Sequence, residues 1–258
     1  MLQKRVIPCL LLHKGGLYKT EKFKNPTYIG DPINAIKIFN EKEVDELLFI
    51  DIDATLNNKE PNYKMIEDIA SECFMPLCYG GGVKNIAQMQ KIYALGVEKI
   101  SLSSSAVLNP LLINEASSRF GNQSVIVTVD IKKDFWGKKK VFIHNGTKNT
   151  KLDPIEFILK IEKLGAGEIV INSVDNDGVM KGYDLELLKE IKSNTKVPII
   201  ALGGAGNLSH IQAAFEISHV DAVACGSMFV YHGPLKGVLI NYPPYQTLTK
   251  LFEPNHAL

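Results

Sequence analysis

Two segments of this chain carry the same glycine turn and the same downstream serine. The first turn is Gly80–Gly82, which Ser104 follows, and the second is Gly203–Gly206, which Ser227 follows. A spacing of 123 residues separates Gly80 from Gly203 and also Ser104 from Ser227. In each copy, one short apolar run precedes the glycines and another ends just before the serine. The chain therefore repeats one pattern of strand, glycine turn, helix, strand and hydroxyl residue.

Eight short apolar runs alternate with amphipathic segments along the 258 residues. Runs that are apolar almost throughout are typical of parallel strands buried on both faces. Four amphipathic segments open with a helix-capping residue: Asp31 before Pro32, Asn85, Asp153 before Pro154, and Asn207. Eight strand–helix units in this length predict an α/β fold, a (β/α)8 barrel, with a doubly wound sheet as the alternative. The runs are Val6–Leu12, Leu47–Ile52, Met75–Cys78, Lys99–Leu102, Ser124–Ile131, Glu168–Asn172, Val197–Ala201 and Ala222–Cys225.

The duplication extends to the predicted strands themselves. Val6–Leu12 matches Val125–Ile131 at an offset of 119 residues. We therefore expect one barrel domain built from two four-stranded half-barrels, about 1–122 and 123–235, with no linker between them. A C-terminal extension, 236–258, follows the second half.

One connection is too long for a simple strand-to-helix loop. Lys132–Thr150 contains an alternating stretch, Lys140–His144, and then Asn145-Gly146. This pattern favours a small hairpin over the active face. We expect Trp136 to pack within the hairpin, with a lid over a ligand as the alternative.

Composition excludes several classes of protein. The 29 basic and 28 acidic residues give a net charge of +1, which argues against nucleic-acid binding. No run approaches 18 apolar residues, and the N-terminal run is too short for a signal peptide, so we expect no membrane association. The four cysteines show no C-x-x-C spacing and no two of the six histidines have ligand spacing. Reduced cysteines, no metal, no cofactor and a cytoplasmic location are therefore expected.

The duplicated turns suit phosphate binding. Glycines and a hydroxyl at strand ends, each before a helix start, are what backbone capture of a phosphate requires. Two copies predict a ligand with a phosphate at each end; tight packing at the turns is the alternative. Lys19, which follows Gly15-Gly16, is either a solvated loop charge or a mobile lysine that closes on a phosphate or the reacting group.

Carboxylates follow three of the predicted strands. They are Asp51 and Asp53, Asp130, and the pair Asp175 and Asp177. Catalytic groups in a barrel lie at the carboxyl ends of the strands, where carboxylates suit proton transfer. Helix caps and structural ion pairs are the alternatives, but Asp130 closes an otherwise apolar strand, where an unused charge is costly. We therefore take Asp130, Asp177 and the loop residue Lys19 as catalytic candidates and Asp51 as a substrate-binding candidate.

Several motifs together are similar to the cyclase subunit of imidazole glycerol phosphate synthase, HisF. The resemblance runs from Met1 to about Phe229. The segments that carry it are Lys4–Leu10, Gly30–Pro32, Asp45–Leu47, Pro76 with Gly80–Gly82, Arg119–Gly121, Gly165–Glu168, Asp177-Gly178, Gly182–Asp184 and Gly203–Asn207.

The resemblance implies a barrel whose C-terminal face binds a bisphosphate-like aminoimidazole ribonucleotide. It implies a glutaminase subunit docked on the N-terminal face, with ammonia passing through the barrel. By matching position, Lys19 is the loop lysine and Asp130 is one of two catalytic aspartates. The implied phosphate sites are Gly82 with Ser104 and Gly204 with Ser227. The implied ring of charges where ammonia enters is Arg5, Glu46, Lys99 and Glu168, for which barrel stability is the alternative role.

The first strand departs from the family. In HisF it ends Cys-Leu-Asp, and that aspartate is the other essential carboxylate, but here the run is Cys9-Leu10-Leu11-Leu12. Leu11 cannot move a proton, and it is the repeat partner of Asp130. Asp53 or Asp177 would have to compensate, although neither starts from the same strand end. Val179 also replaces a hydroxyl residue that follows Asp-Gly in the family.

These departures resemble a paralogous branch of HisF-like proteins associated with acetamidino modification of bacterial surface sugars. The shared features are the leucine run, Lys22–Pro26, and Leu239–Pro243 in a tail that is expected to break the last helix. The resemblance implies an ammonia-channelling subunit that works with a glutaminase and a separate sugar amidotransferase. The alternatives are an authentic histidine-pathway cyclase–lyase and a scaffold that only activates a glutaminase.

Overall fold

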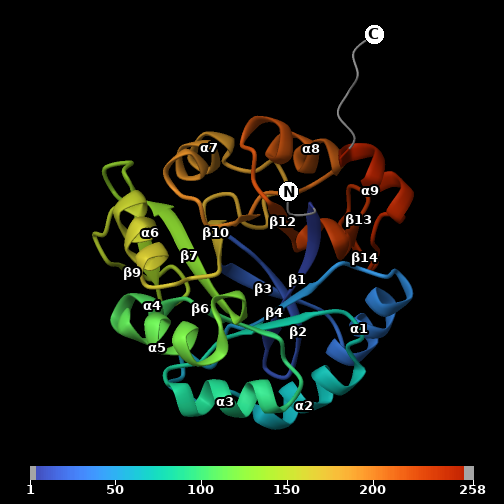
Figure 1. The fold of residues 1–258 in the computed structure, drawn as a ribbon. Helices are drawn as coiled ribbons and strands as arrows, with labels where there is room; N and C mark the ends of the chain where they lie inside the picture. The colour runs from blue at the N-terminus through green and yellow to red at the C-terminus, as the bar shows by residue number, and fades with distance from the viewer. Residues whose placement is uncertain (1–3, 253–258) are drawn as a thin grey trace.

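Eight parallel strands close into a barrel in the computed structural model, which describes residues 4–252 (Figure 1). β1 pairs with β4 on one side and with β12 on the other, and β7 pairs with β10, so the ring has no open edge. The predicted (β/α)8 barrel is confirmed, and the doubly wound sheet is excluded because such a sheet has two edges. The barrel strands are β1 Arg5–His13, β4 Leu47–Asp51, β5 Leu77–Gly80, β6 Lys99–Leu102, β7 Val125–Lys133, β10 Glu168–Ser173, β11 Ile199–Leu202 and β12 Ala222–Cys225.

Helices surround the barrel, and their starts are fixed by the predicted caps. Asp31 Oδ1 accepts from Asn34 N at 3.0 Å, and Asn85 Oδ1 accepts from Gln88 N at 2.9 Å. Asp153 and Asn207 cap their helices in the same way. The helices are α1 Pro32–Glu41, α2 Tyr63–Glu72, α3 Ile86–Ala94, α4 Ser104–Leu108, α5 Leu111–Phe120, α6 Pro154–Lys163, α7 Leu185–Asn194, α8 Leu208–Ile217 and α9 Tyr245–Phe252, with 3-10 turns Asn122–Ser124 and Ser227–Phe229.

The core has two apolar layers. A large cluster packs the helices on the outside of the barrel, and a smaller one fills the inside. The two faces of each strand serve different layers, so Val6 faces the helices and Ile7 the interior. The interior layer contains Ile7, Cys9, Leu48, Cys78, Ile126, Val170, Ile200, Leu202, Ala222 and Ala224. All four cysteines are free thiols, as predicted.

Three hairpins extend beyond the carboxyl ends of the strands. The predicted one is confirmed, with a correction: β8, Lys139–Ile143, pairs with β7 through a turn at 134–138, and Asn145-Gly146 joins β8 to β9, Lys148–Asn149. The other two hairpins were not predicted. They are β2 Gly16–Glu21 with β3 Lys24–Gly30, and β13 Tyr231–His232 with β14 Gly237–Val238.

Two local predictions are wrong. Trp136 is 80% exposed and contacts the ring of Phe135 edge-on, so it does not pack within the hairpin. The tail does form a last helix, α9, because Pro243 and Pro244 precede its first turn rather than interrupting it. Residues 253–258 of the predicted extension, and Met1, lie outside the described residues.

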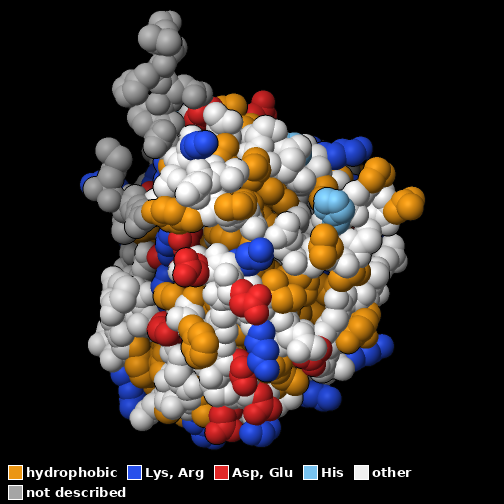
Figure 2. Space-filling view, turned by 90° about the vertical axis from the view of Figure 1, so that its right-hand side faces the viewer, with side chains coloured by type: hydrophobic (Ala, Val, Ile, Leu, Met, Phe, Trp, Pro, Cys, Tyr) orange, Lys and Arg blue, Asp and Glu red, His pale blue; other side chains and the backbone are white. Residues whose placement is uncertain are grey.

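The outer surface carries both signs of charge. On the face that Figure 2 shows, Lys and Arg side chains are interspersed with Asp and Glu, and hydrophobic side chains lie among them. Within residues 4–252, none of the helices is long and apolar enough to cross a membrane.

Candidate active site

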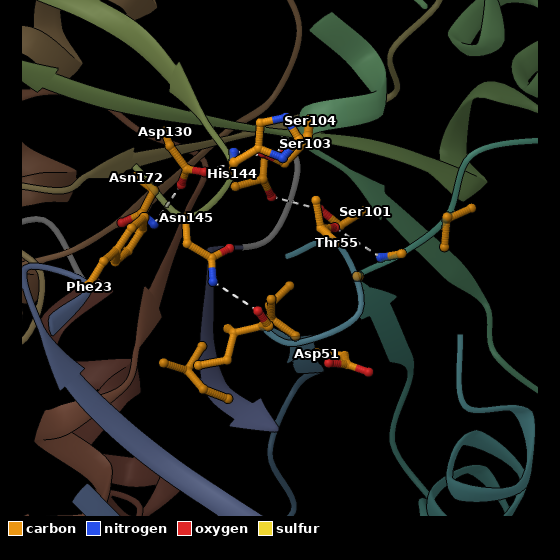
Figure 3. Close-up of a pocket in the computed structure, with 18 of the residues that line it drawn as sticks. Phe23, Asp51, Thr55, Ser101, Ser103, Ser104, Asp130, His144, Asn145 and Asn172 are labelled. Carbon is orange, nitrogen blue, oxygen red and sulfur yellow. Dashed lines mark hydrogen bonds between the residues drawn. The ribbon is translucent and has the colours of Figure 1, made fainter. Parts of the chain in front are cut away.

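A cavity of about 450 Å³ opens at the carboxyl ends of the barrel strands (Figure 3). Its wall includes residues from β1, β4, β5, β6, β7 and β10, so it lies over the barrel axis. This volume is typical of a site for a small metabolite.

Asp130 lies in the cavity wall near the end of β7. Its Oδ1 accepts from Asn172 Nδ2 at 3.0 Å and its Oδ2 from Ser103 Oγ at 3.2 Å (Figure 3). Burial raises the pKa of Asp130 to about 7; the two hydrogen bonds oppose this rise, and the charge of Asp177 adds to it. A carboxyl group with a pKa near neutrality can both take up and release a proton, which suits general acid–base chemistry.

The other predicted carboxylates hold turns. Asp51 Oδ1 accepts from the backbone N–H of Asp53 at 2.8 Å and of Ala54 at 3.1 Å, although Asp51 also lines the cavity. Burial raises its pKa, and these two bonds oppose the rise. Asp53 contacts His13 Nδ1 at 2.6 Å, and Asp175 accepts from Lys133 N at 2.9 Å. Of these three groups, only Asp53 forms an ion pair within residues 4–252, with His13; Asp51 and Asp175 accept backbone N–H groups, and substrate binding by Asp51 stays a prediction.

Lys19 is buried rather than mobile in a loop. It lies in β2, is 5% exposed, and donates from Nζ to the Cys9 carbonyl at 2.5 Å. Burial lowers the pKa of Lys19, while nearby Cys9 and Asp177 oppose this. Burial raises the pKa of Asp177 to about 6, and the Lys19 charge moderates the rise. The β2–β3 hairpin thus brings Lys19 to the cavity wall near Asp177.

The first glycine–serine pair opens into the cavity. Gly82 and Ser104 both line it, together with the neighbouring residues of each motif. Gly81 has a φ of +120°, and a Cβ there would come within 2.8 Å of the Asp51 Cβ, so the turn requires glycine. Ser104 Oγ accepts from His144 N at 3.0 Å. Both residues therefore face the cavity, although Gly82 N already donates to Thr55 Oγ1 at 3.3 Å.

The second glycine–serine pair does not open into the cavity. Gly204 and Ser227 are not among the residues that line the cavity, and Ser227 is 7% exposed. The Gly204 carbonyl accepts from Gly182 N at 2.8 Å, and a Cβ on Gly204 would collide with the Gly182 carbonyl. At the neighbouring Gly226, which does line the cavity, a Cβ would collide with Lys19 Nζ. Anion binding at either pair stays a prediction.

The four predicted charges at the opposite end of the barrel form one ring. Arg5 bonds Glu46 at 2.6 Å and Glu168 at 3.1 Å. Lys99 bonds the same carboxylates at 2.9 and 3.3 Å. Glu168 Oε2 is buried and has no hydrogen-bond partner within the described part of the chain. The ring therefore keeps one free acceptor at the base.

Several residues of the cavity wall were not predicted. Asn172 holds Asp130, and Ser101 Oγ lies 2.6 Å from Thr128 Oγ1. Asn145 Nδ2 donates to the Ile52 carbonyl at 2.8 Å, which ties the β8–β9 turn to β4 (Figure 3). Asn172 could have been found, because it matches Asp51 in the repeat. Leu11 also lines the cavity, and its side chain cannot exchange a proton.

A closed parallel barrel with polar groups around a cavity at its strand ends defines the class: a (β/α)8 barrel of the enzyme type. The family model described as "Histidine biosynthesis protein" matches residues 5–236. The chain is 52% identical, over 96% of its length and 99% of the relative, to a Pseudomonas aeruginosa protein named "Putative imidazole glycerol phosphate synthase subunit hisF2". It is 42% identical, over 89% of its length and 91% of the relative, to the "Imidazole glycerol phosphate synthase subunit HisF" of Clostridium botulinum.

This chain belongs to the HisF family of imidazole glycerol phosphate synthase subunits. This confirms the resemblance that the motifs carry, and it shows that the chain belongs to a cyclase-type enzyme family.

Proposed function

We propose that this chain receives ammonia from a glutaminase subunit and supplies it for converting an acetamido group to an acetamidino group on a bacterial surface-polysaccharide sugar. The observation that carries the proposal is Leu11 in the cavity wall, at the position where HisF has its first catalytic aspartate. Asp130 remains, but cyclisation in the family uses two carboxylates. The cavity therefore keeps a ligand site while lacking half of the proton-transfer pair.

The base of the barrel supports the entry of ammonia there. Arg5, Glu46, Lys99 and Glu168 close a ring around the strand starts, and Glu168 Oε2 is free to accept an N–H. Above the ring, the interior layer is apolar, with small side chains at Cys9, Cys78, Ala222 and Ala224. Neutral ammonia crosses such a layer more readily than ammonium, because an unpaired charge is costly there. A glutaminase docked at this face would release ammonia directly at the ring.

The nitrogen is used on another protein in this proposal. An acetamido group becomes an acetamidino group when its oxygen is activated by a nucleoside triphosphate and leaves as a phosphate while ammonia takes its place. We assign that exchange to a separate amidotransferase that binds the sugar and the nucleotide. The role left to this chain is delivery, and we expect it to take place in the cytoplasm.

An authentic histidine-pathway cyclase is the second candidate. The open Gly82–Ser104 cradle and an Asp130 pKa of about 7 favour it, because both would serve a phosphorylated substrate. A pure glutaminase-activating scaffold is the third; it predicts that Asp130→Asn leaves glutaminase stimulation unchanged.

Complementation separates the first two candidates. A histidine auxotroph that lacks its cyclase subunit is transformed with this chain together with its glutaminase. We expect no growth without histidine. Growth at the rate given by a true HisF would contradict ammonia delivery as the only role.

A further inference from the structure

The turn between β7 and β8 presents two aromatic side chains to solvent beyond the carboxyl end of β7. Phe135 is 93% exposed and Trp136 is 80% exposed, with ring centroids 5.4 Å apart in an edge-to-face arrangement. Single exposed apolar residues are ordinary. Two adjacent exposed aromatics on one turn form an apolar patch, and such patches often mark a site that a partner covers.

The turn is held rigidly. Asp134 Oδ1 accepts from Trp136 N and Lys138 N, both at 2.9 Å, and Asp134 N donates to the Lys138 carbonyl at 2.8 Å. A bond from Lys133 N to Asp175 at 2.9 Å fixes its base to the barrel. A preformed aromatic turn loses little conformational entropy on binding, which is the property of a protein-binding anchor.

The same segment concentrates positive charge. Residues 132–151 contain seven lysines and one carboxylate, Asp134, in a chain with 29 basic and 28 acidic residues. Four of these lysines are exposed and form no salt bridge within residues 4–252: Lys133, Lys138, Lys148 and Lys151. Lys133 and Lys138 flank the turn, whereas Lys148 lies opposite Ile143 at the far end of β8, so the hairpin as a whole complements an acidic surface.

The hairpin also connects this surface to the cavity. β7 carries Asp130 into the cavity wall, and β8 runs directly into His144 and Asn145, which line it. A partner bound at the turn would therefore contact the rim from which a cavity product leaves. It would also shield ammonia from water, which protonates it to ammonium and ends its use as a nucleophile.

We propose that Phe135, Trp136 and the four exposed lysines dock the enzyme that accepts ammonia, through an acidic patch with an apolar pocket. The proposal rests on the proposed function and names the partner surface at the outlet of the same site. Two aromatics on one turn bury too little apolar area to anchor the chain on a bilayer. The segment contains no arginine, the residue that suits dense phosphate recognition best, so nucleic acid fits less well.

The single tryptophan of the chain makes docking directly observable. The chain is labelled with 5-fluorotryptophan, bound to its glutaminase, and titrated with the sugar amidotransferase of the same organism. We expect the one fluorine resonance to shift and saturate. By calorimetry, Phe135→Ser and Trp136→Ser should each weaken binding about 30-fold or more. Lys133→Glu with Lys138→Glu should slow association about tenfold.

Leu235→Ser is the matched control. Leu235 is 96% exposed in the turn between β13 and β14, which pairs with neither β7 nor β8, so its loss should leave this binding unchanged. No shift with the amidotransferase would overturn the proposal. So would a shift produced instead by phosphatidylglycerol vesicles, by single-stranded DNA, or by raising the concentration of the chain alone.

Nitrogen transfer from glutamine to the sugar separates this proposal from the proposed function. If the resonance shifts but no nitrogen is transferred, docking holds and the proposed function fails. If nitrogen is transferred and neither aromatic variant changes transfer or affinity, the function holds and docking fails.

Discussion

Asp130 is a buried carboxylate that has two hydrogen-bond donors and no ion pair among the described residues. Its pKa of about 7 has burial as its main cause. In the unfolded chain, Asp130 ionises near pH 4. Between about pH 4 and pH 7 the folded protein therefore keeps a proton on Asp130 that the unfolded chain has lost. Wild-type stability is therefore lost as the pH rises through this window.

Asp130→Asn should remove that loss while Oδ1 still accepts from Asn172 Nδ2 and the new Nδ2 donates to Ser103 Oγ. We expect the variant to be more stable than wild type by about 4 kcal/mol at pH 8 and equal to it near pH 4. Urea unfolding at both pH values measures this. Asp153→Asn, a helix cap where asparagine serves as well, is the control. A difference that does not change with pH would show that Asp130 ionises normally.

Leu11 is the single change that most separates this cavity from a cyclase site. Leu11→Asp should raise cyclase activity, because it restores a carboxylate at the end of β1. General acid or base groups contribute about 10² to 10⁴ in rate, so a recovery of that size is expected if the cavity is otherwise intact. Turnover of the phosphoribulosyl precursor with ammonia measures it, with Leu11→Asn as the uncharged control. No change would mean that the cavity has diverged beyond this residue.

Among the secondary-structure elements, the N-terminal ends of the barrel strands carry charged side chains that share their ion-pair partners. Glu46 has a side chain 3% exposed and bonds both Arg5 and Lys99. Replacing one member leaves two cations short of a partner, a cost that is larger where the group is buried. The loop before β5 places Phe74 at this same end, held by a bond from Phe74 N to Asn40 Oδ1 at 3.1 Å.

Glu46→Gln should lower the free energy of unfolding by about 2 kcal/mol. The exposed Glu43→Gln, at the same end of the barrel, should change it by less than about 0.5 kcal/mol. Urea unfolding at neutral pH compares them. Equal effects would show that the ring is not a coupled unit.

Phe74 should anchor the glutaminase, since exposed aromatics are typical binding hot spots. Phe74→Ser is expected to weaken glutaminase binding at least about tenfold, whereas Trp136→Ser should not. Calorimetry with the purified glutaminase gives both values. The reverse ranking would mean that the glutaminase docks at the mouth.

In the molecule as a whole, the two copies of the repeat are similar in sequence, but only the glycine–serine pair of the first copy lines the cavity. Gly82 and Ser104 line the cavity, whereas Gly204 packs against Gly182, and Lys19 packs against Gly226, the neighbour of Ser227. Crystals soaked in sulfate should therefore show an anion at the first pair. Occupancy at the second pair should require the β2–β3 hairpin to move. Two empty cradles, or an anion at the second pair alone, would contradict this account of the cavity.

The barrel was predictable because its signals are local. Continuous apolar runs and capping residues such as Asp31 and Asn85 each lie within one element. The burial of Lys19 was not predictable, because it depends on a contact with the Cys9 carbonyl across the β1–β2 pairing. The division into half-barrels remains a prediction.

The route of nitrogen tests the central claim most directly. The chain, its glutaminase and the sugar amidotransferase are supplied with amide-15N glutamine in an excess of unlabelled ammonium, and the 15N content of the sugar is measured by mass spectrometry. Delivery through the barrel predicts an acetamidino nitrogen that comes almost entirely from glutamine. A nitrogen diluted to the level of the bulk ammonium would contradict it.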